Sequence, residues 1–317
     1  MKKFYAIAGI IAGVLIILGG VFTGVGIAAG ADKSFDIFDN VGINIGLPEA
    51  KNMEYTKLKD FNSIDVSANL AGIEIVKSDK KEYAVEYKLY SENPVCEVNN
   101  GKLVIKENKS NIGFNFVFPK FNKYSDSYIR IYVPEGRLDS VKLDTDMGSV
   151  RVNGIESRYF DTDCDMGEVV YEDVKAEDMN INADMGRVVF YGSITGRITA
   201  ELDMGSAELK GYLDCDVDMD CSMGSVDITT YYSKDSYEYD IDTDMGNSSF
   251  DGNGGMQSDT VHKVKIDCDM GSVSMKFEEP KQKERKKARG GRTFSDDGCE
   301  SGRTGASAYA LRDRGVG

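Results

Sequence analysis

The chain has 317 residues, of which 41% are hydrophobic, so it is long enough for one large domain or two ordinary ones. Its formal net charge is −15, and residues 141–280 carry 31 acidic against 11 basic side chains, a net of −20. Because the phosphates of nucleic acid repel such a surface, we exclude nucleic acid as a partner and expect cations, cationic peptides or basic surfaces instead.

An uncharged apolar run extends from Phe4 to Ala29, directly after Lys2 and Lys3. A bilayer core needs roughly 20 helical residues, which this run exceeds, whereas the apolar part of a cleaved signal peptide has about 7–15. We therefore predict an uncleaved signal-anchor transmembrane helix at residues 1–30, although "GIAAGAD" also permits cleavage. The positive-inside rule then predicts a single-pass protein of the cell membrane, with its C-terminal domain outside the cytoplasm.

Residues 31–60 are expected to be a tether, and residues 61–140 contain short alternating segments such as "GIEIV" and "KLVIKE" that predict strands. The "NNG" at residues 99–101 is typical of a hairpin turn between two of these strands. We expect residues 61–140 to form the first rungs of a repeat region or a cap on its open edge, which would otherwise promote aggregation.

Met-Gly pairs then recur along the chain, and the spacings between them are 19, 19, 19, 19, 22 and 25. They begin at Met147, Met166, Met185, Met204, Met223, Met245 and Met270. A constant period of roughly 20 residues is typical of a stacked solenoid. On both sides of each pair, apolar or small residues alternate with polar ones, as in strands with one buried face. Each unit is therefore predicted to be a strand, a glycine corner, a second strand and a turn.

These patterns predict an all-β fold, a parallel β-helix-like solenoid of about 19-residue rungs over residues 61–280, with the Met-Gly repeats at 141–280. An antiparallel array of hairpins is the alternative, because a unit of this length can also form one hairpin. In the parallel stack, equivalent residues of neighbouring rungs lie about 4.8 Å apart. We assign the methionine column to the core, where Met fills gaps, and a soft-metal site is the alternative.

Six cysteines in an extracytoplasmic protein suggest disulfides, but the predicted stack argues against them. Cys164 and Cys221 would lie three rungs apart, and Cys221 and Cys268 two rungs apart, about 14 Å and 10 Å. A disulfide needs Cα atoms within roughly 7 Å, so we expect buried free thiols. There is no CxxC motif or Cys/His cluster, so we expect no zinc site.

Acidic residues occupy outward positions one and three residues before most of the methionines, and stacking would align them in two columns. Like charges about 4.8 Å apart repel by roughly 0.9 kcal/mol per neighbouring pair in water. A solvated face that keeps the protein soluble is the simpler interpretation. The alternative is a cation-binding ladder, with Ca²⁺ as the expected ion. The ladder would comprise Asp144, Asp146, Asp163, Asp165, Asp184, Asp203, Asp220, Asp242, Asp244, Asp267 and Asp269.

No catalytic motif of the GxSxG, P-loop or HExxH type occurs, and the single histidine, His262, falls in a polar insertion where we expect a surface loop. Catalytic carboxylates need different environments, whereas the repeated acidic positions are equivalent. We therefore predict a non-catalytic protein without a cofactor. The alternative is a polysaccharide-processing β-helix enzyme that uses clustered aspartates. Residues 281–317, with a net charge of +5, are predicted to be a disordered basic tail.

The order of an N-terminal apolar segment, "FNSIDVSANLAGIEIVKSD", "GKLVIKE" and units containing "DMGSVRV" resembles the bacterial DUF4097 family over about residues 60–280. The chain differs from that pattern in having Met before the glycine, where Ser is commoner. The resemblance implies a β-solenoid exposed at the cell envelope, a candidate adhesin without known catalysis, in a family also linked to envelope stress. It supplies no active-site residues. Cell-wall polymers, cationic peptides and envelope proteins are the expected partners.

Overall fold

The computed structural model of the protein describes residues 50–91, 93–107 and 127–280. The predicted transmembrane helix, most of the predicted tether and the predicted basic tail lie outside these residues. No helix in the described ranges is long and apolar enough to cross a membrane.

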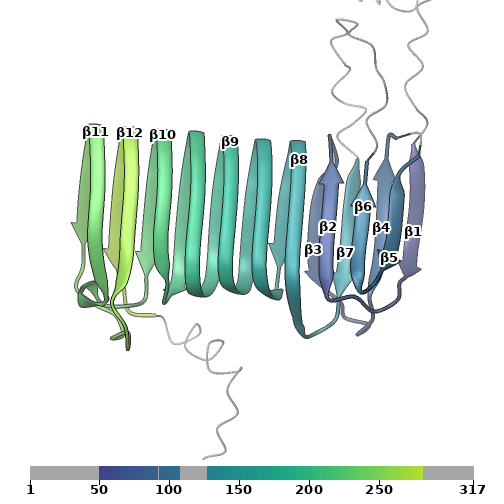
Figure 1. The fold of residues 1–317 in the computed structure, drawn as a ribbon, viewed down its shortest axis with the longest axis horizontal. Helices are drawn as coiled ribbons and strands as arrows, with labels where there is room; N and C mark the ends of the chain where they lie inside the picture. Colours follow the sequence, from purple (N-terminus) through teal and green to yellow (C-terminus); the bar gives the residue numbers. More distant parts are fainter. Residues whose placement is uncertain (1–49, 92, 108–126, 281–317) are drawn as a thin grey trace, which may run out of the picture. The chain divides into compact units, whose positions relative to one another are not determined.

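The described chain is almost entirely β-structure, with one short 3₁₀ helix, η2 (Lys234–Ser236) (Figure 1). The strands are β1 (Lys51–Lys57), β2 (Ser63–Ala68), β3 (Gly72–Lys77), β4 (Ala84–Leu89), β5 (Val95–Asn99), β6 (Lys102–Lys106), β7 (Tyr128–Val133), β8 (Arg137–Asn153), β9 (Glu156–Leu213), β10 (Asp216–Thr230), β11 (Tyr237–Asp251) and β12 (His262–Phe277). The sheet order is β1-β4-β7-β3-β8-β9-β10-β12-β11, and β2 pairs with β6 and β8. The all-β prediction is confirmed.

The Met-Gly repeats stack in parallel and in register. Met147 of β8 pairs with Met166 of β9, and Met204 of β9 pairs with Met223 of β10. Strand β9 itself contains three Met-Gly corners, and their glycine backbones lie directly over one another. These parallel pairings exclude the antiparallel array of hairpins and confirm stacked rungs.

Each rung has two arms joined at the Met-Gly corner, and the core lies between the arms. The ring of Phe160, before the corner, meets the ring of Tyr171, after it, with centroids 5.3 Å apart. Tyr171 in turn lies 6.4 Å from Phe190 of the next rung. All three side chains are fully buried, so successive rungs share one continuous apolar core.

The segments before the repeats extend the same stack. Strands β2 and β3 pair in parallel with the two arms of β8, so together they form a further rung whose corner lacks a Met-Gly pair, and β6 and β7 pair in parallel with its other side. Glu107 holds that corner, because its carboxylate accepts hydrogen bonds from the backbone N–H groups of Asn69 (2.8 Å) and Leu70 (3.2 Å). The N–H of Met147 donates to the carbonyl oxygen of Asn69 at 2.8 Å, which joins this corner to the next.

Antiparallel strands complete the N-terminal end. Strand β4 pairs with β1 and β7, and β5 pairs with β6. Residues 51–57 therefore belong to the sheet, and the tether prediction does not hold for them. The predicted hairpin at "NNG" is confirmed, because Asn100 (φ 51°) and Gly101 (φ 78°) link β5 to β6 with the two positive φ angles of a type I′ turn.

The last two rungs do not stack in chain order. Strand β12 pairs with β10 on one side and with β11 on the other. The Met270 rung therefore lies between the Met223 rung and the Met245 rung, and the Met245 rung is terminal. The repeat spacings here are longer than elsewhere, 22 and 25 instead of 19. Three extra extended residues reach about 10 Å, roughly twice the distance between strands, which allows the chain to pass one rung and return.

Candidate functional site: the methionine edge

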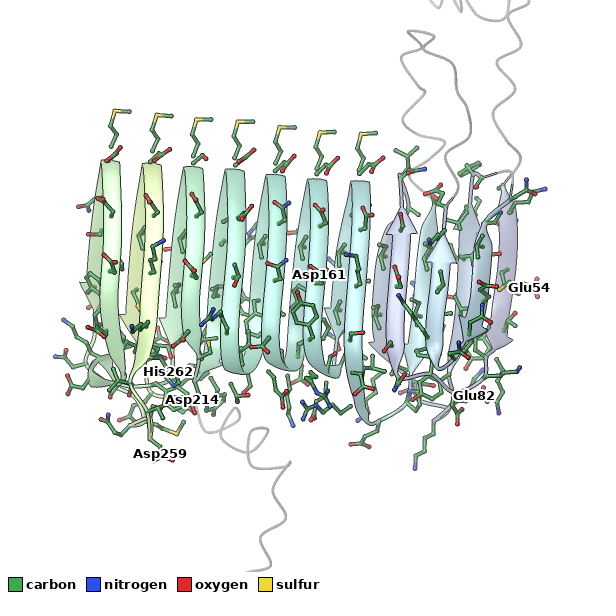
Figure 2. All side chains as sticks on the ribbon, viewed as in Figure 1. Glu54, Glu82, Asp161, Asp214, Asp259 and His262 are labelled. Atoms are coloured by element: carbon green, nitrogen blue, oxygen red, sulfur yellow. The ribbon has the colours of Figure 1, made fainter. Side chains whose placement is uncertain are left out.

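The seven methionines of the Met-Gly corners lie along one edge of the repeat region. Six of these side chains are 39–43% exposed, and Met245 in the terminal rung is 67% exposed. Figure 2 shows them as a row of sulfur-tipped side chains beyond the ends of the strands. The assignment of this column to the core was therefore wrong. We call the set the methionine edge: Met147, Met166, Met185, Met204, Met223, Met270 and Met245.

The cause is a change of phase at the corner. Before each methionine except Met245 in the terminal rung, the buried side chains stand two, four and six residues away, whereas after it they stand three and five residues away. In an uninterrupted strand, inward positions keep a period of two, so the methionine would point inward. The shift from even to odd positions instead leaves the corner residue outside both arms. The shift itself is present in the sequence, but the turn of the backbone that leaves the methionine outside is seen only in the structure.

The glycine after each methionine allows the corners to pack closely. A Cβ atom on Gly205 would lie 2.0 Å from the carbonyl oxygen of Gly186, and one on Gly186 would lie 1.9 Å from that of Gly167. No side chain fits at such distances, so only glycine lets each corner lie directly over the previous one. The methionines consequently follow one another at the spacing of neighbouring strands, about 4.8 Å.

The aspartates predicted as a ladder lie on the outward side of the first arms. Asp144 pairs with Asp163, and Asp267 pairs with both Asp220 and Asp242, so the register aligns them in a column. A second column stands one residue before the methionines. Their side chains are exposed or half-buried: Asp144, Asp146, Asp163, Asp165, Asp184, Asp203, Asp220, Asp242, Asp244, Asp267 and Asp269. In the part of the chain that the structure describes, no three His, Cys, Asp or Glu residues form a group suited to hold a metal ion. Ca²⁺ binding by these columns stays a prediction.

Burial and like charge within the column act together on Asp163. Desolvation by the neighbouring rungs raises the pKa of its carboxyl group, and the carboxylates of Asp144 and Asp165 raise it further. The folded protein therefore binds more protons than the unfolded chain between the ordinary and the raised pKa. Stability from this group is highest at low pH and is lost as pH rises through that window.

Asp163→Asn should accordingly stabilise the protein at neutral pH. We expect a gain on the order of 0.5 kcal/mol or less at pH 7, the scale of one cross-strand charge repulsion, and no gain at about pH 3, where the aspartate is already neutral. Denaturant unfolding at both pH values measures it. Asp259→Asn, an equal charge change in an exposed connection outside the columns, is the control. Equal stabilities of the two variants at pH 7 would contradict the prediction.

Comparison with protein families decides the classification. The family model described as Toastrack DUF4097 matches residues 61–296. The chain belongs to the Toastrack DUF4097 family. The resemblance seen in the sequence is thereby confirmed. No similarity to a curated protein was found.

Several solved structures resemble this Toastrack chain at low sequence identity. A candidate cell adhesion protein from Clostridium sporogenes is 11% identical, covering 73% of this chain and 100% of its own, with a TM-score of 0.37. A candidate adhesin from Parabacteroides merdae is 10% identical, covering 72% and 96%, with a TM-score of 0.36. A candidate lipid binding protein from Parabacteroides distasonis is 17% identical, covering 74% and 98%, with a TM-score of 0.26. The family assignment rests on the family model and not on these similarities.

The sequence suggested that the histidine of this Toastrack chain lies in a surface loop, but the structure places it in a strand. His262 begins β12, its side chain is 13% exposed, and its Nε2 atom lies 2.8 Å from Oδ1 of Asp214 (Figure 2). The Ser258 hydroxyl lies 3.3 Å from the same Nε2 and donates to the same Asp214 oxygen at 2.5 Å. In a Ser-His-Asp triad, serine and aspartate contact different ring nitrogens. This cluster therefore fastens the connection before β12 to the Asp214 turn and does not build a nucleophile.

The cysteine geometry differs from the prediction at one pair. Because β12 lies directly against β10, Cys221 pairs with Cys268 in neighbouring rungs, and the predicted two-rung separation was wrong. The five described cysteines are free thiols. Burial raises the pKa of Cys221 to about 12, and the adjacent Cys268 adds to the effect. A thiol that stays protonated at neutral pH is a poor nucleophile, so these side chains act as small apolar core residues.

Proposed function

We propose that this Toastrack chain is a membrane-anchored, extracytoplasmic binding protein of the adhesin type, which acts by presenting its repeated surface. The uncharged run from Phe4 to Ala29 after two lysines supports the anchor and its orientation. The match to the family model makes the chain a Toastrack DUF4097 protein, and the adhesin role is our proposal for this member.

The observation that carries a binding role is the equivalence of the rungs. Along the described stack, the same outward side chains recur at the same register positions in most rungs, as Asp144 over Asp163 and Met204 over Met223 illustrate. Such a surface offers many identical contacts, which suits an extended partner with its own repeat. Hydrolysis of a glycosidic bond instead needs two carboxyl groups held in different environments on either side of that bond. The geometry therefore favours binding over the polysaccharide-processing alternative.

The charge of the surface indicates the partner class. Residues 141–280 have a net charge of −20, and the aspartate columns concentrate this charge on one face. A cationic peptide, a basic envelope protein or a cell-wall polymer with positive groups would be attracted to it, and the attraction would weaken with added salt.

Anchoring and orientation are tested with the full chain carrying a C-terminal tag, expressed in bacteria. We expect the protein to stay in the membrane fraction after carbonate washing. We also expect added protease to cleave it in cells whose wall or outer membrane has been removed. Recovery in the soluble fraction, or protection from external protease, would overturn the anchored and extracytoplasmic part of the proposal.

Binding is tested by immobilising the detergent-purified full chain and passing polylysine peptides and cell-wall polysaccharide over it. We expect salt-sensitive retention of the peptide, reduced several-fold by Asp165→Asn with Asp184→Asn in adjacent rungs. A matched variant, Glu54→Gln with Asp259→Asn, removes the same charge outside the columns and should bind nearly normally. The binding proposal fails if neither probe is retained, and the aspartate columns are not the contact surface if both variants lose affinity equally.

A further inference from the structure

We propose that the methionine edge is a binding site for soft monovalent cations, Cu(I) or Ag(I), held by the thioether sulfurs of methionines in adjacent rungs. The site is distinct from the aspartate columns, and it does not depend on the adhesin-type function proposed above.

The recurrence of methionine at an exposed position is the first reason. Several buried positions vary from rung to rung, and the one five residues after the methionine is Val152, Tyr171, Phe190 and Leu209 in successive rungs. The corner residue is methionine in all seven repeats, although its side chain packs into no core and polar residues are the usual choice at such exposure. Packing explains the glycine of each pair, but it does not explain the methionine. A property of the exposed thioether itself accounts for the repetition.

The spacing of the sulfurs is the second reason. Register pairing joins Met147 to Met166, Met204 to Met223, and Met270 to both Met223 and Met245, so the side chains leave the backbone about 4.8 Å apart. Methionine has three rotatable side-chain bonds, so sulfurs of two or three neighbouring rungs can converge on one ion without backbone movement. Soft thioether ligands select Cu(I) over hard cations.

The surrounding charge is the third reason. Asp165, Asp184 and Asp203 each precede a methionine of the edge, so the negative potential beside the sulfurs concentrates cations. Their hard oxygens do not compete for a soft ion. The same carboxylates disfavour other occupants of the edge. A second copy docked edge to edge would bring like charges together, and an anionic lipid surface would be repelled.

The test uses the detergent-purified full chain labelled with [¹³C]methyl-methionine and titrated with Ag(I) nitrate in chloride-free buffer. Ag(I) avoids any change of oxidation state. We expect the methyl signals of the methionine edge to shift and to saturate at about two to three ions per chain, if each ion takes two or three sulfurs. The signal of Met256, which is 40% exposed but off the edge, should not move.

Matched variants then separate thioether binding from thiol binding. Met166→Leu with Met204→Leu and Met270→Leu keeps the size and apolarity of three side chains in alternate rungs but removes their sulfurs, so that no two methionines remain in adjacent rungs. We expect Ag(I) affinity at the edge to fall at least about tenfold, with an unchanged melting temperature because the side chains are exposed. Met256→Leu is the control and should bind normally. All variants keep every cysteine, so any thiol binding is a common background.

Three results would overturn the proposal. Ag(I) uptake without movement of the methionine signals would assign binding to the thiols. Unchanged affinity in the triple variant would exclude the edge. Loss of concentration-dependent self-association in that variant, without loss of Ag(I) binding, would make the edge an interface between copies.

Millimolar Ca²⁺ serves as the hard-cation control and should leave the methionine signals unmoved. A rise in melting temperature in Ca²⁺ alone would support the aspartate ladder, and an unchanged midpoint would contradict it.

Discussion

Gly205→Ala is expected to destabilise the repeat region by about 3 kcal/mol or more. The new Cβ would lie 2.0 Å from the carbonyl oxygen of Gly186. The corner cannot move away, because a Cβ on Gly224 of the next rung would lie only 1.7 Å from the oxygen of Gly205, so the backbones are equally close on both sides. Relief therefore requires the rungs to separate, which breaks hydrogen bonds between strands.

Denaturant unfolding of the full chain, followed by circular dichroism, measures this loss. Gly254→Ala is the control, because its nearest non-neighbouring atom would lie at 3.6 Å, an ordinary contact distance. Since each rung touches only its neighbours, the clash should also split the transition and let the two halves of the stack unfold at different denaturant concentrations. If Gly205→Ala unfolded together with Gly254→Ala in one transition, the close packing of the corners would be refuted.

Phe190→Ala is expected to cost about 3–5 kcal/mol, the usual range for removing a buried aromatic ring. Phe190 is fully buried in the middle of the stack, where its ring lies 6.4 Å from that of Tyr171. The neighbouring rungs are fixed by backbone pairing on both sides, so the cavity cannot collapse and its full cost remains. Thermal and denaturant unfolding of the full chain measure the effect.

Phe250→Ala provides a matched comparison, because Phe250 occupies the same repeat position in the terminal rung. Its side chain is 41% exposed and packs mainly against Tyr239, with ring centroids 5.1 Å apart. We expect a loss of about 1 kcal/mol, since less apolar surface is uncovered and the open end can relax. Equal losses at the two positions would mean that burial along the stack is uniform, in conflict with the terminal position of β11.

The sequence by itself determined the repeat and the strand alternation, and it favoured the parallel register that the structure confirms. With a constant period, parallel strands in register place Met over Met and Gly over Gly. Every buried residue then packs against the equivalent residue of the neighbouring rung. The aspartate columns follow from the same register without further information. The turn at Asn100 and Gly101 was also determined locally, because those residue types tolerate the positive φ angles that a two-residue hairpin needs.

Only the tertiary structure decided the order of the last rungs and the direction of the methionines. The two longer spacings at the end of the repeats permit either order, and the pairing of β12 with both β10 and β11 selects one, which makes Cys221 and Cys268 neighbours. The direction of the methionines depends on how the backbone turns at the corner, because the turn interrupts the period of two that governs a straight strand. The alternation of apolar and polar residues identifies the residues of each arm. The turn of the backbone between the two arms decides whether the methionine at the corner faces the core or the solvent.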